Sequence, residues 1–177
     1  MERKIKMKRI FALTLAALLL LTAAGCTKKD AATGGVEGST SQIIDKIYAN
    51  HKALELDVGT MDLDLADDNA VSYNTGLKTG EKIRQASVSE AMMGQAYSLV
   101  VLRVKDAADA PEIAQEVYDN INTRKWICVE ADTKTVMYAG DVVVLFMIDS
   151  EFGDVATVES IQEAFRAVCG GSMTIVG

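Results

Sequence analysis

Histidine, proline and cysteine are scarce in this chain, whose 177 residues include one His, one Pro and three Cys. A single His, without the paired spacing of zinc ligands, excludes the common zinc sites. Basic residues are also few, since residues 26–177 contain 13 Lys and Arg against 24 Asp and Glu. The resulting net charge of −11 disfavours nucleic acid as a partner, because binding its backbone requires clustered positive charge.

Catalytic signatures are missing as well. The chain has no Gly-x-Ser-x-Gly, no His-Glu-x-x-His and no Ser-x-x-Lys motif. It is rich in apolar residues, which make up 49% of the chain, enough to build the core of a folded domain. The sequence therefore predicts one domain without a recognisable metal, cofactor or catalytic site.

The first 25 residues are organised like a secretory signal peptide. Five basic residues within positions 3–9 precede an apolar run over 10–24, and small residues follow it. As a helix, residues 10–25 span roughly 24 Å, which is less than a hydrocarbon core of about 30 Å. A transmembrane anchor is therefore the weaker interpretation.

The end of this segment, Ala23-Ala24-Gly25-Cys26, resembles the lipobox of bacterial lipoproteins. Those proteins usually have Leu three positions before the cysteine, where this chain has Ala23. The resemblance implies that Cys26 is linked to diacylglycerol, becomes the first mature residue and anchors the protein in the lipid bilayer. It implies a location on the outer face of the cytoplasmic membrane. A plain secretory signal or a retained anchor is the alternative.

Residues 27–40 have the composition of a flexible tether, with three Gly and one sizeable apolar residue. A segment of this length has a root-mean-square extension of about 20 Å. We therefore divide the chain into a signal peptide (1–25), the lipidated Cys26 with its tether (26–40), and a single domain (41–177).

Helical spacing of apolar residues predicts a helix over 41–54. The acidic stretch 56–80 is interpreted as a loop with a short helix over 67–73. A capping-box arrangement at Asp109–Glu112, with Pro111 in the first turn, predicts a helix whose apolar face extends to Cys128. Asp154 is expected to cap the last helix.

Strand patterns cover residues 83–92, 97–105, 135–139 and 142–148. The order strand–strand–helix thus occurs twice, which indicates an internal duplication or a chance similarity between strands. The most economical fold class is α+β. We expect a two-layer domain with a mainly antiparallel four-stranded sheet, two helices on one face, and the N-terminal helix at an edge or beside them.

Several features together resemble a known group. They are the lipobox cysteine, an N-terminal helix, an acidic stretch, the run Ala96–Lys105, Lys125-Trp126, and Gly140-Asp141-Val142-Val143-Val144. Over residues 42–150 the chain resembles small lipoproteins of clostridial-type Firmicutes that share a domain of unknown function. The resemblance supplies no activity, substrate or binding residue.

Few residues qualify as candidates for chemistry. His51 would need a partner such as Ser41 or a carboxylate to form a catalytic triad, and we favour an amphipathic residue at a helix end. The acidic stretch offers oxygen ligands for calcium, but the EF-hand spacing counted from Asp62 fails, and a solvated loop is the better interpretation. The stretch consists of Asp57, Asp62, Asp64, Asp67, Asp68 and Asn69.

Met92-Met93 and Trp126 are candidates for binding, although each is expected to fill or cover the edge of the core. Cys128 and Cys169 end the two predicted sheet-covering helices. If a two-fold axis perpendicular to the sheet relates these helices, their equivalent ends lie roughly 24 Å apart, beyond the 7 Å or so that a disulfide spans. We therefore expect free thiols.

These observations favour a non-catalytic binding or accessory module of the cell envelope, with an envelope protein, polymer or small ligand as partner. One alternative is a cell-wall hydrolase that uses only carboxylates. Another is a small solute-binding lipoprotein.

Overall fold

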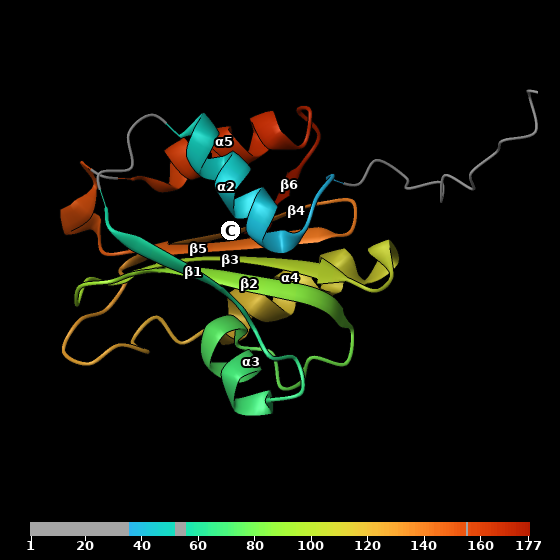
Figure 1. Ribbon diagram of the computed structural model, residues 1–177, viewed down its shortest axis with the longest axis horizontal. Coiled ribbons are helices and arrows are strands. Elements are labelled where there is room, and N and C mark those ends of the chain that lie inside the picture. The colour runs from blue at the N-terminus through green and yellow to red at the C-terminus, as the bar shows by residue number, and fades with distance from the viewer. Residues whose placement is uncertain (1–35, 52–55, 155) are drawn as a thin grey trace, which may run out of the picture. The chain divides into compact units, whose positions relative to one another are not determined.

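The computed structural model describes residues 36–51, 56–154 and 156–177. Its centre is a six-stranded antiparallel sheet with the strand order β1-β2-β3-β5-β4-β6 (Figure 1). The strands are β1 (Val58–Asp62), β2 (Ile83–Ala91), β3 (Tyr97–Val104), β4 (Thr133–Ala139), β5 (Val142–Ile148) and β6 (Thr174–Ile175). The helices are α2 (Thr40–Asn50), α3 (Asp68–Thr75), α4 (Ala110–Asn120) and α5 (Val158–Val168), with short 3-10 turns at Ala107–Asp109 and Ser150–Phe152.

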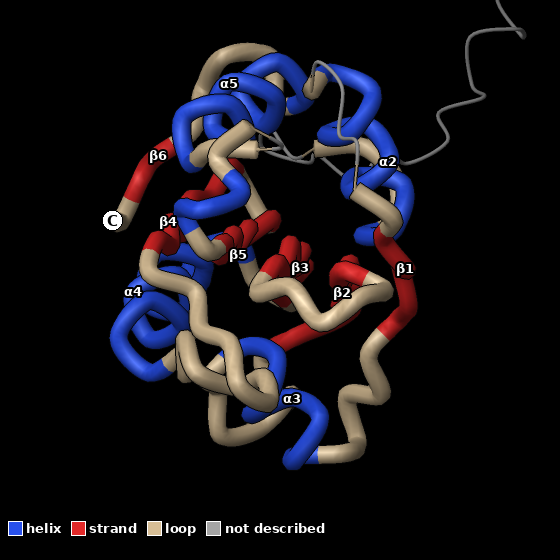
Figure 2. The backbone as a smooth tube through the Cα atoms, turned by 90° about the vertical axis from the view of Figure 1, so that its left-hand side faces the viewer, coloured by secondary structure: helices blue, strands red, loops and turns tan. Residues whose placement is uncertain are grey.

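Helices cover both faces of the sheet. Helices α2 and α5 pack on one face, and α3 and α4 pack on the other (Figure 2). The predicted α+β class and antiparallel pairing are therefore confirmed. The expected two layers, with four strands and the helices on one face, are wrong.

The sequence of the central strands explains the third layer. In β3, Tyr97, Leu99 and Val101 face one hydrophobic core, while the alternate residues from Val100 to Val104 face the other. Strand β5 is apolar and buried at every position, and its residues likewise face the two cores in alternation. Strands that are apolar at every position require cover on both faces, whereas a half-exposed strand alternates apolar and polar residues.

Strand β2 carries serines on the face that α2 covers. Thr40 Oγ1 lies 2.6 Å from Ser87 Oγ, and Tyr48 Oη donates to Ser89 Oγ at 2.7 Å. The hydroxyl groups of the strand are thus paired by the helix packed above them, as buried polar groups require. Helix α2 itself begins with a capping box formed by Ser39 and Gln42.

The ends of two helices differ from expectation. Helix α4 ends at Asn120, so Cys128 lies in the loop 121–132, and Asp109 makes no side-chain capping bond. Ile121 already has extended backbone angles, and the Asn122 side chain accepts the Arg124 N–H, a local turn that competes with further helix. The last helix is capped by Thr157 rather than Asp154.

The acidic stretch contains more structure than the sequence indicated. It holds the edge strand β1, and its short helix spans Asp68–Thr75. Gly76 ends this helix with a φ of 77°, and a Cβ there would lie 2.5 Å from the backbone nitrogen of Ile121. The position therefore requires glycine both for its conformation and for the close approach of the segment at Asn120–Ile121.

The two strand–strand–helix units are β2-β3-α4 and β4-β5-α5. Because α4 and α5 cover opposite faces, a two-fold axis perpendicular to the sheet cannot relate them, and the arrangement assumed for Cys128 and Cys169 is wrong. Within the described part of the chain, neither cysteine is bonded to another. Among the described helices, none is long and apolar enough to cross a bilayer.

Candidate functional site

The sheet has two distinct ends. Tyr97 pairs with Ile148 and Ile148 with Thr133, so residues 92–96, 121–132 and 149–154 lie together at what we call the loop end. Residues 36–39 and the Gly140-Asp141 turn lie at the opposite end, which we call the entry end. In Figure 1 the loop end is on the left and the entry end on the right.

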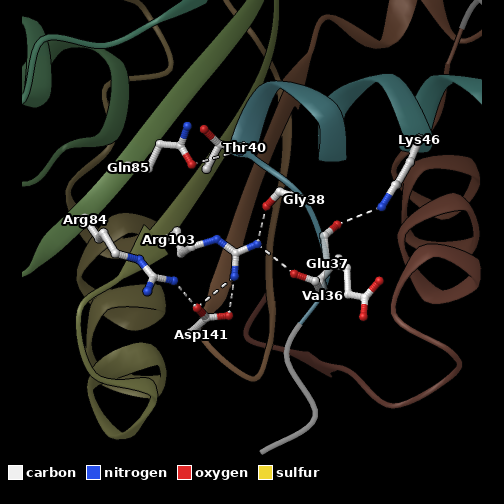
Figure 3. Close-up of polar contacts among 9 residues, drawn as sticks. All are labelled: Val36, Glu37, Gly38, Thr40, Lys46, Arg84, Gln85, Arg103 and Asp141. Carbon is white, nitrogen blue, oxygen red and sulfur yellow. Dashed lines mark hydrogen bonds and ion pairs between the residues drawn. The ribbon is translucent and has the colours of Figure 1, made fainter. Parts of the chain in front are cut away.

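A buried arginine holds the chain at the entry end. Arg103 Nη1 contacts both carboxylate oxygens of Asp141 at 2.7 and 2.8 Å, and Nη2 donates to the carbonyls of Val36 and Gly38, each at 2.7 Å (Figure 3). Val36 is 5% exposed. Residues 36–40 are therefore packed on the domain, although their composition had assigned them to the tether. Residues 1–35, which include Cys26, the signal peptide and the rest of the tether, lie outside the described residues.

A buried lysine organises the loop end. The side chain of Lys125 is 1% exposed, and its Nζ lies 2.5 Å from Glu90 Oε1. It also donates to Asn74 Oδ1 at 3.3 Å and to Ser98 Oγ at 3.2 Å. The pair ties the loop 121–132 to the end of β2. Burial lowers the pKa of Lys125, and the nearby Glu90 carboxylate opposes this shift.

Two aromatic rings complete the surroundings of Lys125. Its Nζ lies 5.0 Å from the centre of the Tyr73 ring and 5.1 Å from that of Trp126. Tyr73 Oη donates to the Lys125 carbonyl at 3.1 Å. Trp126 packs against the core, as expected. These contacts fix the first half of the loop, so the residues that follow project from a rigid support.

Three exposed apolar side chains lie in the loops of the same end. Met92 and Met93 are 64% and 72% exposed, and Ile127 is 92% exposed. The expectation that the Met pair fills a core edge is therefore wrong. The reason is that the positions follow the last buried residues of β2 and lie in the turn beyond the helical layers. We call Met92, Met93 and Ile127 the apolar patch.

His51 lies beside an open hollow of about 430 Å³ between the end of α2 and the start of α5. It is 8% exposed, and its Nε2 lies 2.8 Å from Ser160 Oγ. Ser41, the partner considered from sequence, bonds instead to Ser39 at the other end of α2.

The hydrogen bonds of Ser160 set the direction of its bond to His51. Ser160 Oγ donates to the Thr157 carbonyl at 2.8 Å and accepts the Thr157 N–H at 2.9 Å. With its proton given to Thr157, Ser160 Oγ is left to accept, and we therefore assign the ring proton to His51 Nε2. A general base must accept the proton of its nucleophile, so this pair has the opposite polarity to a catalytic dyad. Burial lowers the pKa of His51, in keeping with a neutral imidazole whose Nδ1 has no partner among the described residues.

Three of the residues considered for calcium serve local structure. Asp67 caps α3, Asp64 accepts the Ala66 N–H, and Asp62 accepts the Ser87 hydroxyl. Within the described ranges, no three His, Cys, Asp or Glu side chains are grouped closely enough to hold a metal ion.

Sequence reasoning missed four residues that organise these sites: Glu90, Lys125, Arg103 and Ser160. Two signals were available. Arg103 interrupts the apolar run from Leu99 to Val104, and a charge in such a run needs a buried partner. Lys125 precedes Trp126, and the pair was noted only as a resemblance. In comparisons with family models, curated proteins and solved structures the chain has no match, so its likeness to the clostridial-type lipoproteins stays a prediction.

Proposed function

We propose that this protein is a lipid-anchored extracytoplasmic lipoprotein whose domain is a non-catalytic binding module of the cell envelope. The observation that carries the proposal is that the two ends of the sheet differ in structure. At the entry end, Arg103 and Asp141, which we call the clamp, hold the segment that follows the tether. The apolar patch projects from a rigid support at the loop end.

The position of the clamp sets the reach of the domain. Residues 27–35 separate Cys26 from the clamped Val36, and an extended chain of that length reaches about 35 Å at most. Strand β2 adds about 30 Å between the two ends. Anchoring through Cys26 therefore keeps the entry end nearer to the membrane and leaves the loop end available to envelope partners.

The polar hollow at His51 supports a binding role over hydrolysis. Asp154 and Glu163 line it, and both are exposed to solvent. A carboxylic acid that protonates a leaving group at neutral pH needs a raised pKa, which burial in an apolar pocket provides. Exposed carboxylates lack that environment.

The anchor is tested by metabolic labelling with an alkyne-bearing fatty acid. The full chain should be labelled and found in the membrane fraction, and Cys26→Ala should lose both properties. Cys128→Ala is the matched control, because Cys128 is an exposed thiol that is free in the structure. Label that persists in Cys26→Ala, or disappears in Cys128→Ala, contradicts the proposal.

A further inference from the structure

We propose that the apolar patch, formed by Met92, Met93 and Ile127, is a docking surface for an extracytoplasmic protein that presents apolar side chains within a basic surface. This inference deepens the proposed function by naming the surface and the chemistry of its partner. It rests on the exposure of the patch, on the support beneath it and on the charge around it.

The patch combines exposure with rigidity. Ile127 is two residues from Lys125, whose side chain is buried and paired with Glu90 near the end of β2. Met92 and Met93 follow that strand, and the Met92 N–H donates to the Asp57 carbonyl at 2.9 Å. Met92 also packs over β1, since a Cβ on Gly59 would lie 2.7 Å from its sulfur. A surface that is already ordered loses less entropy on binding, and Met adapts to irregular partner shapes.

Acidic side chains outnumber basic ones at the loop end. Asp132, Asp149, Glu151 and Asp154 lie in the segments of the loop end, and Asp57, just before β1, accepts the Met92 N–H through its carbonyl. The described basic side chains of its loops are already engaged, because Arg124 pairs with Glu130 and Lys125 with Glu90. The electrostatic complement of this end is a positively charged surface.

The negative charge of the loop end also distinguishes between possible binding partners of the patch. A second copy of this chain would bring the same acidic loops together, and the anionic surface of a membrane would repel them. By contrast, Lys82, Arg84 and Lys105 lie at the entry end, at the start of β2 and just after β3. A basic protein surface is therefore the partner that fits.

The test uses the full chain in neutral phosphatidylcholine nanodiscs, titrated into a labelled peptide of alternating Lys and Leu. We expect binding to weaken at least about tenfold in the triple variant Met92→Ser/Met93→Ser/Ile127→Ser, because exposed hydrophobic anchors dominate such contacts. The control is Met61→Ser/Ile175→Ser, which removes two exposed apolar side chains at the sheet edges. It should bind within about twofold of the parent chain.

Two further arms test the chemistry of the partner. A Lys–Ser peptide of equal charge should bind at least about tenfold more weakly than the Lys–Leu peptide. Glu151→Lys/Asp154→Lys should weaken binding, whereas Asp45→Lys/Glu81→Lys, which makes the same change in charge away from the loop end, should not. Equal binding by the triple variant, or by the Lys–Ser peptide, overturns the proposal.

Two other results would identify a different binding partner for the patch, and either would overturn the proposal. A dimer that the triple variant abolishes would make a second copy the partner, and flotation with phosphatidylglycerol vesicles that depends on the patch would make it a membrane site. The patch lies within residues 92–127, so the same titration can be run on the unanchored Cys26→Ala chain. Failure of the anchor and failure of the docking surface are thereby distinguished.

Discussion

The buried pair of Lys125 and Glu90 offers the sharpest test of how the loop end is held. At a separation of 2.5 Å, two unit charges attract by about 6–7 kcal/mol at an effective dielectric constant near 20. Removing each ion from water costs several kcal/mol, so the pair as a whole is close to balanced. The cost of breaking it depends on which ion is left behind.

The two partners differ in exposure, which makes the cost asymmetric. The Lys125 side chain is 1% exposed and that of Glu90 is 29% exposed. Glu90→Gln leaves a buried ammonium without its counter-charge and should destabilise the fold by about 3–4 kcal/mol. Lys125→Met leaves a carboxylate that water can reach and keeps an apolar chain against Tyr73 and Trp126, so it should cost only about 1–2 kcal/mol.

The double variant completes the cycle. Glu90→Gln/Lys125→Met should cost less than the sum of the single changes by about 1–3 kcal/mol, because neither buried charge remains. Urea unfolding of residues 27–177, followed by far-UV circular dichroism and by the fluorescence of the single Trp126, measures all three variants. Additive costs, or a larger cost for Lys125→Met than for Glu90→Gln, would refute the reasoning.

The pH dependence of Glu90→Gln provides an independent readout. Without the carboxylate, burial lowers the pKa of Lys125 further below its unfolded value. The unfolded chain then binds more protons than the folded one between the two pKa values. The stability of this variant should therefore rise more steeply with pH than that of the parent over the interval below the ordinary lysine pKa of 10.5.

Two other predictions concern the clamp and the histidine. Arg103→Gln leaves the Val36 and Gly38 carbonyls without their donor and Asp141 with only Arg84, and should cost about 3 kcal/mol. Arg84→Gln, whose side chain is 55% exposed, should cost less than about 1 kcal/mol. Only the first variant frees the backbone on both sides of the exposed Glu37, so it alone should be cleaved faster there by the protease Glu-C. Equal cleavage of both variants would contradict the clamp. His51, the single histidine of the chain, has a pKa below its ordinary value because it is buried, so the unfolded state takes up a proton first. The contribution of His51 to the stability of the fold should be fully present above about pH 6.5 and decline as the pH falls below it. In urea unfolding, His51→Gln should remove that part of the decline. An unchanged pH profile would show that His51 does not titrate as proposed.

Local patterns predicted much of the fold correctly. Both hairpins, β2–β3 and β4–β5, and the core of each long helix were evident, because period-two and helical spacing depend only on neighbouring residues. The short helix of the acidic stretch was anticipated within two residues. Strands β1 and β6 were missed, because Gly59 and an exposed Met61 give β1 no alternation and β6 has only two residues.

The candidate site was less accessible to sequence reasoning. Met92-Met93 and His51 were singled out, but the exposure of the Met pair and the bond from His51 to Ser160 were not foreseen. His51 and Ser160 are 109 positions apart. No local spacing indicates a contact over such a distance, and the same holds for Lys125 and Glu90.

By itself, the sequence determined the α+β class, the antiparallel hairpins and an acidic domain, and it supports the prediction of a lipid anchor at Cys26. Only the tertiary structure decided that α4 and α5 cover opposite faces, that Arg103 clamps residues 36–38, and that Lys125 is buried. The physical reason is that secondary structure follows from the pattern of neighbouring side chains. The face on which a helix packs, and the charge that a buried residue meets, follow instead from how the whole chain covers both faces of its apolar central strands.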